Sequence, residues 1–331
     1  MRLPVGKLPS ACLRRLLRLC PSSPRVLVPP AIGQDAAALD FAGRVVVAKT
    51  DPITFATDRI GWYAVNINAN DVACLGAAPR FFLATVLLPE GEATEAMAES
   101  IFRDLADSAE ALGVALCGGH TEITYGLGRP IVVGHMLGET TREGLVSNDA
   151  GRAGDEVVLT KGIAIEGAAI LARERGREVE DRELVARARR FLDDPGLSVV
   201  PDAAAICQAV HPHALHDPTE GGLATGLHEL ADAAGLGVAV EAEAIPVLPE
   251  AEALCRRWGL DPMGLIASGA LLAVTAPEDT EAALEALRDA GVPARRIGRM
   301  VPRSEGVSVC RAGRREPLPR FDSDELARVF G

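Results

Sequence analysis

Apolar runs bounded by polar or turn-forming residues recur along the chain and predict short buried strands. The first run covers residues 45–49 and ends at Thr50-Asp51-Pro52. Another covers residues 114–117 and leads directly into Gly118-Gly119. The remaining predicted strands cover residues 80–88, 130–138, 156–160, 238–241, 270–275, 295–300 and 307–311.

Apolar residues at helical spacing predict helices between these strands. One helix is expected over residues 60–75, where Gly76 and Pro79 stop it, and a second over residues 94–112, which Gly113 ends. Further helices are predicted over residues 167–173, 184–191, 203–210, 222–234 and 281–290. Because both halves of the chain mix strands with covering helices, we expect α+β or α/β layers in each half.

The basic N-terminus also contains a helical pattern. Leu13, Leu16, Leu17 and Cys20 fall on one helical face, and Ser10 is placed to cap it. A targeting segment is the alternative, but arginines interrupt every apolar stretch, so no continuous apolar region exists. The pattern therefore favours an amphipathic helix packed on the body of the protein.

Length and composition narrow the class of protein. At roughly 100–200 residues per domain, 331 residues predict two domains, with a candidate boundary in the polar, glycine-rich stretch 147–155. The formal net charge of −12 repels a phosphate backbone and argues against general nucleic-acid binding. A hydrophobic share of 48% excludes disorder for the bulk of the chain.

Neither a membrane nor an oxidising compartment is indicated. No apolar run approaches the ~20 residues needed to span a bilayer. The seven cysteines are odd in number and none is spaced as a Cys-x-x-Cys pair. Cysteines of this kind are typical of small core residues in a reducing compartment, so we expect a cytoplasmic protein.

The common nucleotide signatures are missing, but four polar segments beside small residues suggest another kind of site. The chain has no P-loop motif and no Gly-x-Gly-x-x-Gly after a predicted strand. Carboxylates and amides instead sit at predicted strand ends or helix starts in residues 33–37, 49–52, 68–72 and 217–222. Such groups can hold Mg²⁺ while the bare backbone approaches a polyphosphate. Each segment alone fits a helix cap or turn; together, the four favour a metal–nucleotide site.

Two further segments admit more than one interpretation. Gly118-Gly119-His120-Thr121-Glu122 follows a strand and predicts a turn whose N–H groups meet a phosphate, or a plain tight turn. The histidines in residues 211–216, beside Asp217, have spacing that can chelate zinc. We favour a plain loop there, because Pro212 constrains the geometry and no cysteine accompanies the histidines.

These motifs, in this order, resemble the superfamily of aminoimidazole ribonucleotide synthetase (PurM-like). That group also includes selenophosphate synthetase, thiamine monophosphate kinase and the hydrogenase-maturation carbamoyl dehydratase, and the likeness is greatest to hydrogenase-maturation-factor (HypE)-like members. The resemblance extends from about residue 3 to about residue 311. Its motifs are Leu3–Leu8, Ile32–Ala37, Asn70–Ala73, Gly118–Glu122, Leu159–Gly162 with Glu166-Gly167, Asp217–Gly222, and Asp261–Leu265 with Ala267–Leu271.

The resemblance implies an α+β, two-domain PurM-like fold. An N-terminal arm with the amphipathic helix is expected over residues 1–30, an ATP-binding domain over 31–150 and an α/β layered domain over 151–331. The ATP-binding domain is expected to pair its sheet with that of a second copy, which forms a shared β-barrel in a homodimer. ATP is expected in a cleft between the domains, reached by both subunits.

The resemblance also assigns residues to the site. Asp35, Asp51 and Asp71 match the family's metal and phosphate aspartates, and Asp217 matches its acidic position in the C-terminal domain. The catalytic residue is not identified, and the candidates are Lys49, His120 and Glu122. The expected nucleotide-binding residues are Asp35, Lys49, Asp51, Asn70, Asp71, Gly118, Gly119 and Thr121.

The sequence leaves the role of two lysines open. Lys49 and Lys161 either add fixed positive charge near the phosphates or are surface lysines with buried stems. His120, similarly, either contacts phosphate or substrate or simply packs.

Departures from the family pattern argue against two known reactions. The carbamoyl dehydratase carries its substrate on a C-terminal cysteine, whereas no cysteine follows Cys310 here; it also has Lys where this chain has Glu122, and Glu where it has Ser268. We therefore do not expect dehydration of a cysteine-borne carbamoyl group. Cys12 and Cys20 lack the glycine-rich setting of the reactive residue of selenophosphate synthetase.

The leading hypothesis is an ATP- and Mg²⁺-dependent homodimeric enzyme. The family's shared chemistry uses the γ-phosphate of ATP to activate an amide, carboxylate or phosphate oxygen, here on an unknown small molecule or protein terminus. The alternatives are a catalytically reduced nucleotide-binding accessory protein and a small-molecule kinase of the thiamine monophosphate kinase type. Nucleic acid and membranes are not expected as partners.

Overall fold

A computed structural model describes residues 8, 10–21, 23–54, 58–321 and 323–330. The chain divides into two compact units. The N-terminal unit comprises residues 23–29 and 35–145, and the C-terminal unit comprises residues 1–22, 30–34 and 146–331. Of the Leu3–Leu8 motif, only Leu8 lies within the described residues.

The predicted N-terminal helix is present as α1 (Ser10–Leu17). Its apolar positions are not uniformly covered: Leu13 and Leu17 are half-buried, whereas Leu16 is 41% exposed, and Cys20 lies exposed beyond the end of the helix. No helix among the described residues combines the length and the apolar character that a membrane crossing requires.

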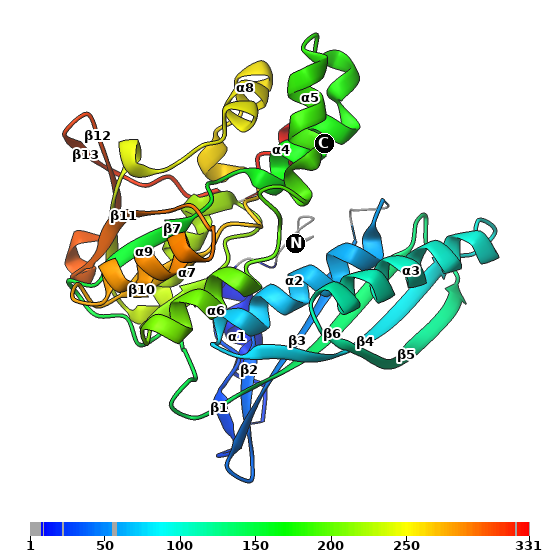
Figure 1. Ribbon diagram of the computed structural model, residues 1–331, viewed down its shortest axis with the longest axis horizontal. Helices are drawn as coiled ribbons and strands as arrows, with labels where there is room; N and C mark the ends of the chain where they lie inside the picture. The colour runs from blue at the N-terminus through cyan, green and yellow to red at the C-terminus, as the bar shows by residue number, and fades with distance from the viewer. Residues whose placement is uncertain (1–7, 9, 22, 55–57, 322, 331) are drawn as a thin grey trace. The chain divides into compact units, whose positions relative to one another are not determined.

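The N-terminal unit is a six-stranded sheet with two helices on one of its faces (Figure 1). The sheet order is β1-β2-β3-β6-β4-β5, and only the β4–β5 pair is parallel. The two helices contact each other, and α2 packs on the central strands. The elements are β1 (Val26–Val28), β2 (Ala37–Phe41), β3 (Arg44–Ile53), α2 (Ile60–Cys74), β4 (Ala78–Pro89), α3 (Glu95–Ala111), β5 (Ala115–Thr124) and β6 (Ile131–Thr140).

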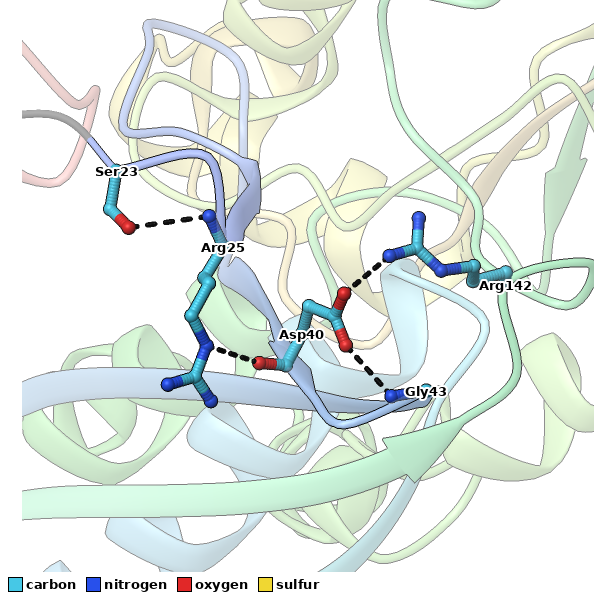
Figure 2. Close-up of polar contacts among 5 residues, drawn as sticks. All are labelled: Ser23, Arg25, Asp40, Gly43 and Arg142. Carbon is cyan, nitrogen blue, oxygen red and sulfur yellow. Dashed lines mark hydrogen bonds and ion pairs between the residues drawn. The ribbon is translucent and has the colours of Figure 1, made fainter.

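Polar contacts fix the β2–β3 hairpin at its tight turn (Figure 2). Ala42 and Gly43 both have positive φ, and the Gly43 amide donates a 3.0 Å hydrogen bond to the Asp40 carboxylate. This bond, together with the Arg142 guanidinium on the same carboxylate, holds the pKa of Asp40 below its usual value. Arg25 donates from Nε to the Asp40 carbonyl at 2.9 Å, which ties β1 to the hairpin.

Glycines on β6 allow α2 to lie close to the sheet. A Cβ at Gly134 would lie 2.3 Å from the Asn68 Nδ2 atom, and one at Gly138 would lie 2.3 Å from a Val72 methyl group. Side chains at these two positions would push the helix away from the strands. The small residues of β6 therefore bring the polar second half of α2 onto β3 and β6.

The other face of this sheet carries no helix among the described residues. Alternation along the strands places His120 and Glu122 on this open face. The same face carries half-buried apolar residues of three strands, namely Val46, Leu83, Leu87, Val133 and Leu137.

The C-terminal unit is a seven-stranded sheet with the order β13-β12-β9-β11-β7-β10-β8. Its strands pair antiparallel apart from β9 and β12. The elements are β7 (Glu156–Thr160), α4 (Ile165–Glu174), α5 (Arg182–Arg189), α6 (Val200–Ala209), β8 (Ala214–His216), α7 (Gly222–Ala234), β9 (Gly237–Glu241), α8 (Pro249–Trp258), β10 (Leu272–Thr275), α9 (Thr280–Asp289), β11 (Ala294–Val301), β12 (Val307–Arg311), β13 (Arg314–Pro317) and α10 (Ala327–Phe330).

One apolar cluster forms the core between this sheet and α7. Leu223, Leu227 and Leu230 of α7 pack with Leu159 and Leu272 of the central strands, and all five are essentially buried. The chain thus builds mixed sheets with helices in both units, as the α+β prediction requires. The shared barrel and the homodimer remain predictions.

Candidate functional site

Three predicted site residues meet on β3 and α2. The Lys49 Nζ atom lies 3.2 Å from an Asp71 oxygen and 3.6 Å from an Asp51 oxygen. Asp71 is 8% exposed, whereas Asp51 is 39% exposed. The sequence therefore brings two of the predicted metal-binding carboxylates to either side of one ammonium group.

Buried amides of α2 support this cluster. The Asn68 Nδ2 atom donates to the Ala64 carbonyl at 2.8 Å and to the Asp51 carbonyl at 3.3 Å, which joins the helix to β3. Asn66 donates in the same way to the Trp62 carbonyl one turn earlier. Polar groups in a helix interior need such partners, because an unpaired buried amide is costly. Asn70, a predicted nucleotide-binding residue, is also fully buried here.

Asp35 lies two residues before β2, on one of the predicted polar segments. A carboxylate oxygen of Asp35 lies within 4.8 Å of the Cys74 sulfur at the end of α2. Cys74 is buried, and it was not predicted as a site residue, because a lone cysteine in an apolar helix is usually a core residue.

The donor set of this region fits a hard divalent cation. Asp35, Asp51 and Asp71 offer carboxylate oxygens, the ligands that Mg²⁺ prefers. The two carboxylates around Lys49 already hold one cation between them. The role of Asp51 and Asp71 as magnesium ligands remains a prediction.

The Gly118–Glu122 segment is a strand, which corrects the predicted turn. These residues lie within β5 and pair in parallel with β4. Gly119 has φ +154°, and a Cβ there would lie 1.9 Å from the Ala84 carbonyl oxygen, so Gly119 allows close strand packing. The sequence could not reveal this, because a Gly-Gly pair is more typical of a turn.

The predicted site residues of β5 lie apart from the Lys49 cluster within one copy of the chain. Asp51 and Gly119 share one row across the sheet, because Asp51 pairs with Gly134, Gly134 with Ala84, and Ala84 with Gly119. Three steps of ~4.8 Å separate these strands by roughly 14 Å.

The catalytic candidates also divide between the two faces of the sheet. Lys49 faces α2, whereas strand alternation places His120 and Glu122 on the open face, with Thr121 on the opposite side from them. His120 Nε2 lies 3.2 Å from a Glu122 oxygen, and the Thr124 hydroxyl donates to Glu122 at 2.8 Å. These hydrogen bonds, led by that of Thr124, lower the pKa of Glu122.

Asp217 occupies a turn of the C-terminal unit, directly before α7. It is 2% exposed, and the turn ends with Gly221 and Gly222, both with positive φ. A Cβ at Gly222 would lie 2.5 Å from the Met263 carbonyl oxygen, so this turn packs against the 261–265 motif. The predicted loop at 217–222 is therefore present.

Two other predicted turns are wrong. Residues 49–52 do not end a strand, because β3 continues to Ile53. Residues 68–72 lie inside α2 rather than at a helix start. Tertiary packing explains both differences, since the pairing of β3 with β6 carries the strand past Pro52 and burial retains the asparagines in the helix.

Lys161 is not a surface lysine with only its stem buried. Its side chain is 5% exposed, and Nζ lies 3.1 Å from an Asp202 oxygen and donates to the Ser198 carbonyl at 2.6 Å. Burial lowers the pKa of Lys161, and the Asp202 carboxylate opposes this effect. Lys161 is thus committed to a buried ion pair of the C-terminal unit.

His213 and His216 have separate partners, and residues 214–216 form strand β8, which corrects the predicted plain loop. His213 Nδ1 lies 2.7 Å from Asp155, whereas His216 Nε2 lies 3.1 Å from Glu229 of α7. Two neighbouring histidines with separate carboxylate partners do not form a zinc site.

Comparison with known proteins supports the family assignment. The model of the AIR synthase related protein N-terminal domain matches residues 33–140, and that of the C-terminal domain matches residues 152–311. A carbamoyl dehydratase HypE from Cupriavidus necator is 33% identical over 279 residues, covering 81% of this chain and 77% of that protein. The Escherichia coli protein of the same name is 30% identical over 331 residues, covering 87% of this chain and 89% of that protein.

A solved structure extends the likeness to three dimensions. The hydrogenase maturation protein HypE in complex with ATP has a TM-score of 0.74 and 27% identity, covering 93% of this chain and 92% of that one. A structure described as AaThiL complexed with AMPPCP and TMP shares the fold, with a TM-score of 0.73 at 20% identity and coverage of 94% of each chain. This chain is therefore a HypE-like member of the AIR synthase related family, within the PurM-like superfamily.

Proposed function

We propose that this protein binds ATP with Mg²⁺ and uses it to activate an oxygen atom of a second substrate. The observation that carries the proposal is the Lys49–Asp51–Asp71 cluster, which combines carboxylate ligands for a metal with a cation for a phosphate. The ATP-bound HypE relative supports it by analogy. Asp35 and Asn70 complete the ligand set proposed for the N-terminal unit, and Asp217 is the ligand proposed for the C-terminal unit.

The proposed chemistry is phosphoryl transfer. An amide, carboxylate or phosphate oxygen attacks the γ-phosphorus and ADP leaves. Magnesium, when bound, neutralises the charge that develops on the phosphate oxygens. Asp51 and Asp71 hold this ion, and Lys49 orients a phosphate as a point charge. An oxygen that has become a phosphate ester can leave in a later step.

We further propose that the active form is a homodimer. The edge strand β5 is exposed along its length, with Leu116 37% and Ile123 65% exposed, and Tyr125 just beyond its end is 88% exposed. An exposed edge with apolar side chains is a template for pairing with another chain. Pairing of two copies would cover this edge and the half-buried apolar face of the sheet. It would also bring β5 of one copy, with Gly118, Gly119 and Thr121, toward its partner.

Isothermal titration with Mg-ATP tests the proposed site. Asp71→Asn and Asp51→Asn remove one negative charge each, and we expect at least a tenfold loss of affinity from each change. Asp107→Asn, on the exposed surface of α3, makes the same change in charge away from the cluster and is expected to bind like the unmodified protein.

Two results would overturn this proposal. Absence of binding at millimolar Mg-ATP would reject nucleotide binding altogether. Unchanged affinity in both aspartate variants, with folding verified by circular dichroism, would show that the nucleotide lies elsewhere.

An accessory protein that binds ATP without rapid turnover is the second candidate. Glu122 favours it, because the resemblance places a lysine there and the carboxylate instead engages Thr124 and His120. Hydrolysis assays with a metabolite panel that includes carbamoyl phosphate and thiamine monophosphate separate the possibilities. Substrate-stimulated turnover eliminates the accessory protein, and a phosphorylated product identifies a kinase.

A further inference from the structure

A buried amide joins α2 to the strand that carries Asp51. Asn68 is 0% exposed, and its Nδ2 atom donates to the Ala64 carbonyl at 2.8 Å and to the Asp51 carbonyl at 3.3 Å. The first bond stays within the helix. The second crosses from α2 to β3 and reaches the backbone of a proposed magnesium ligand, so Asn68 links the position of Asp51 to that of the helix.

The two bonds also fix the orientation of the Asn68 amide. A reversed amide would place Oδ1 against two carbonyl oxygens, which accept hydrogen bonds and cannot donate them. Both N–H groups of the amide are used by these carbonyls. The Oδ1 atom is buried and has no hydrogen-bond partner in the part of the chain that the structure describes.

Core packing alone does not account for an asparagine at this position. A buried acceptor without a partner lowers the stability of a fold. A leucine has a similar size and would fill the same space without a polar atom. The bond from Nδ2 to β3 is therefore the feature of Asn68 that an apolar residue could not supply.

The space around the Asn68 amide is tightly filled. Asp51 pairs with Gly134 of β6, and Asn68 lies over this glycine. A Cβ at Gly134 would lie 2.3 Å from the Asn68 Nδ2 atom and 2.9 Å from a carbon of the Phe82 ring. The amide is thus held between the helix and the sheet, and it restricts movement of β3 relative to α2.

The same helix carries the second proposed magnesium ligand. Asp71 follows Asn68 by three residues, so both residues lie on one side of α2. The Lys49 Nζ atom lies 3.2 Å from an Asp71 oxygen and 3.6 Å from an Asp51 oxygen. The Asn68 amide therefore ties together the two elements, α2 and β3, from which the two carboxylates project.

Asn66 provides an internal comparison. It is also buried in α2, at 5% exposed, and its Nδ2 atom donates to the Trp62 carbonyl at 2.9 Å. This bond has the same helical spacing as that of Asn68 to Ala64. Within the described residues, Asn66 makes no hydrogen bond to β3, so the bond to Asp51 distinguishes Asn68 from Asn66.

We propose that Asn68 is a positioning residue that gives the Asp51–Asp71 pair its selectivity for Mg²⁺ over Ca²⁺. This inference rests on the proposed function, because it takes the two carboxylates as magnesium ligands. Mg²⁺ demands a near-ideal octahedron of oxygens, whereas Ca²⁺ accepts longer and more variable distances. Carboxylates whose spacing is fixed by a buried hydrogen bond suit the more demanding ion. Loss of the bond lets Asp51 shift relative to Asp71 and penalises Mg²⁺ more than Ca²⁺.

Isothermal titration with the ATP analogue AMPPCP, in the presence of Mg²⁺ or of Ca²⁺, tests the proposal. For Asn68→Ala, we expect the affinity for Mg-AMPPCP to fall by about tenfold or more, as for residues that orient metal ligands. The affinity for Ca-AMPPCP is expected to fall by less than about threefold, because calcium sites tolerate variable geometry. The ratio of the two affinities is the readout.

Asn66→Ala is the matched control. It removes a buried amide of the same helix and leaves the bond between Asn68 and Asp51 in place. Any general weakening of α2 should affect both complexes alike, so the ratio should equal that of the unmodified protein. An equal change of the ratio in Asn66→Ala and Asn68→Ala would overturn the proposal.

Asn68→Leu separates positioning from folding. Leucine fills the space that alanine leaves empty, so this variant should unfold at a higher temperature than Asn68→Ala. It cannot donate to the Asp51 carbonyl, and the preference for Mg²⁺ should be lost as in Asn68→Ala. A restored preference in Asn68→Leu would assign the effect to packing and contradict the role of the amide.

The unmodified protein distinguishes failure of this inference from failure of the proposed function. If it does not bind Mg-AMPPCP, the nucleotide site itself is rejected. If it binds Mg-AMPPCP and Asn68→Ala has the same ratio of affinities, the nucleotide site stands and the role of Asn68 is refuted.

Discussion

At the scale of single residues, the largest electrostatic difference lies between buried and exposed ion pairs. Lys161 and Asp202 are 5% and 1% exposed, and Asp202 also accepts a 2.7 Å hydrogen bond from Thr160. Lys161→Ala leaves Asp202 buried without its cation, so we expect the free energy of unfolding to fall by roughly 3–5 kcal/mol. Urea unfolding monitored by circular dichroism measures this change.

An exposed pair provides the control for that experiment. Arg296 lies 2.7 Å from Glu156, but its side chain is 60% exposed. Arg296→Ala is expected to cost less than about 1 kcal/mol. Equal losses in the two variants would contradict a special role for the buried pair.

The individual residues also show how far sequence reasoning reaches. Lys49 and Asp51 were predicted from one segment and Asp71 from another, and the fold brings them together. The closeness of Cys74 to Asp35 was not predicted, because the two residues are remote in sequence. Proximity of this kind leaves no periodic signal in a single chain.

At the scale of secondary structure, the contact of α2 with β6 depends on glycine. Gly138→Ala would place a methyl group 2.3 Å from Val72 and 2.9 Å from the Ala78 carbonyl oxygen. We expect it to lower the free energy of unfolding by about 1–3 kcal/mol, because the rigid strand cannot retreat from the helix. Thermal unfolding by differential scanning calorimetry is a suitable measurement.

Gly128→Ala is the corresponding control in the same unit. A Cβ at Gly128 meets no atom within 4 Å, so its replacement should leave the stability nearly unchanged. If both variants unfold at the temperature of the unmodified protein, a side chain at Gly138 does not disturb the packing of α2 on β6.

Elements with a dense apolar pattern were predicted well, and elements without one were not. The predicted ranges of β7 and α7 agree with the structure, because both carry dense apolar patterns in the core. By contrast, β8 has three residues within a histidine-rich segment, and β13 is exposed throughout, so neither shows a hydrophobic pattern. Their strand geometry comes from pairing with neighbours rather than from local sequence.

At the scale of the whole molecule, the exposed edge of the N-terminal sheet leads to a prediction about assembly. Pairing of β5 edges would bury Ile123 and Leu116, so light scattering after size exclusion should report twice the mass of one chain. Ile123→Glu puts a charge on that edge and is expected to give a monomer. A monomeric unmodified protein at micromolar concentration would reject the proposed homodimer.

The assignment of the reaction is also a question for the whole molecule. The family shows the fold, but the acceptor of the phosphoryl group is expected to depend on positions where this chain departs from the family pattern. Glu122 and Ser268 are predicted to be two such positions, and Glu122 accepts a hydrogen bond from Thr124. Substrate assays, rather than further comparison with related proteins, will therefore identify the reaction.

The position of Lys49 has a consequence for the order in which ligands assemble. Its ammonium already serves as counter-ion to Asp51 and Asp71, so the fold can do without a metal, and a chelator should leave the melting temperature unchanged. A divalent ion arriving alone would have to compete with this built-in charge. A triphosphate gives the lysine a new anion, so magnesium and nucleotide would each strengthen the binding of the other.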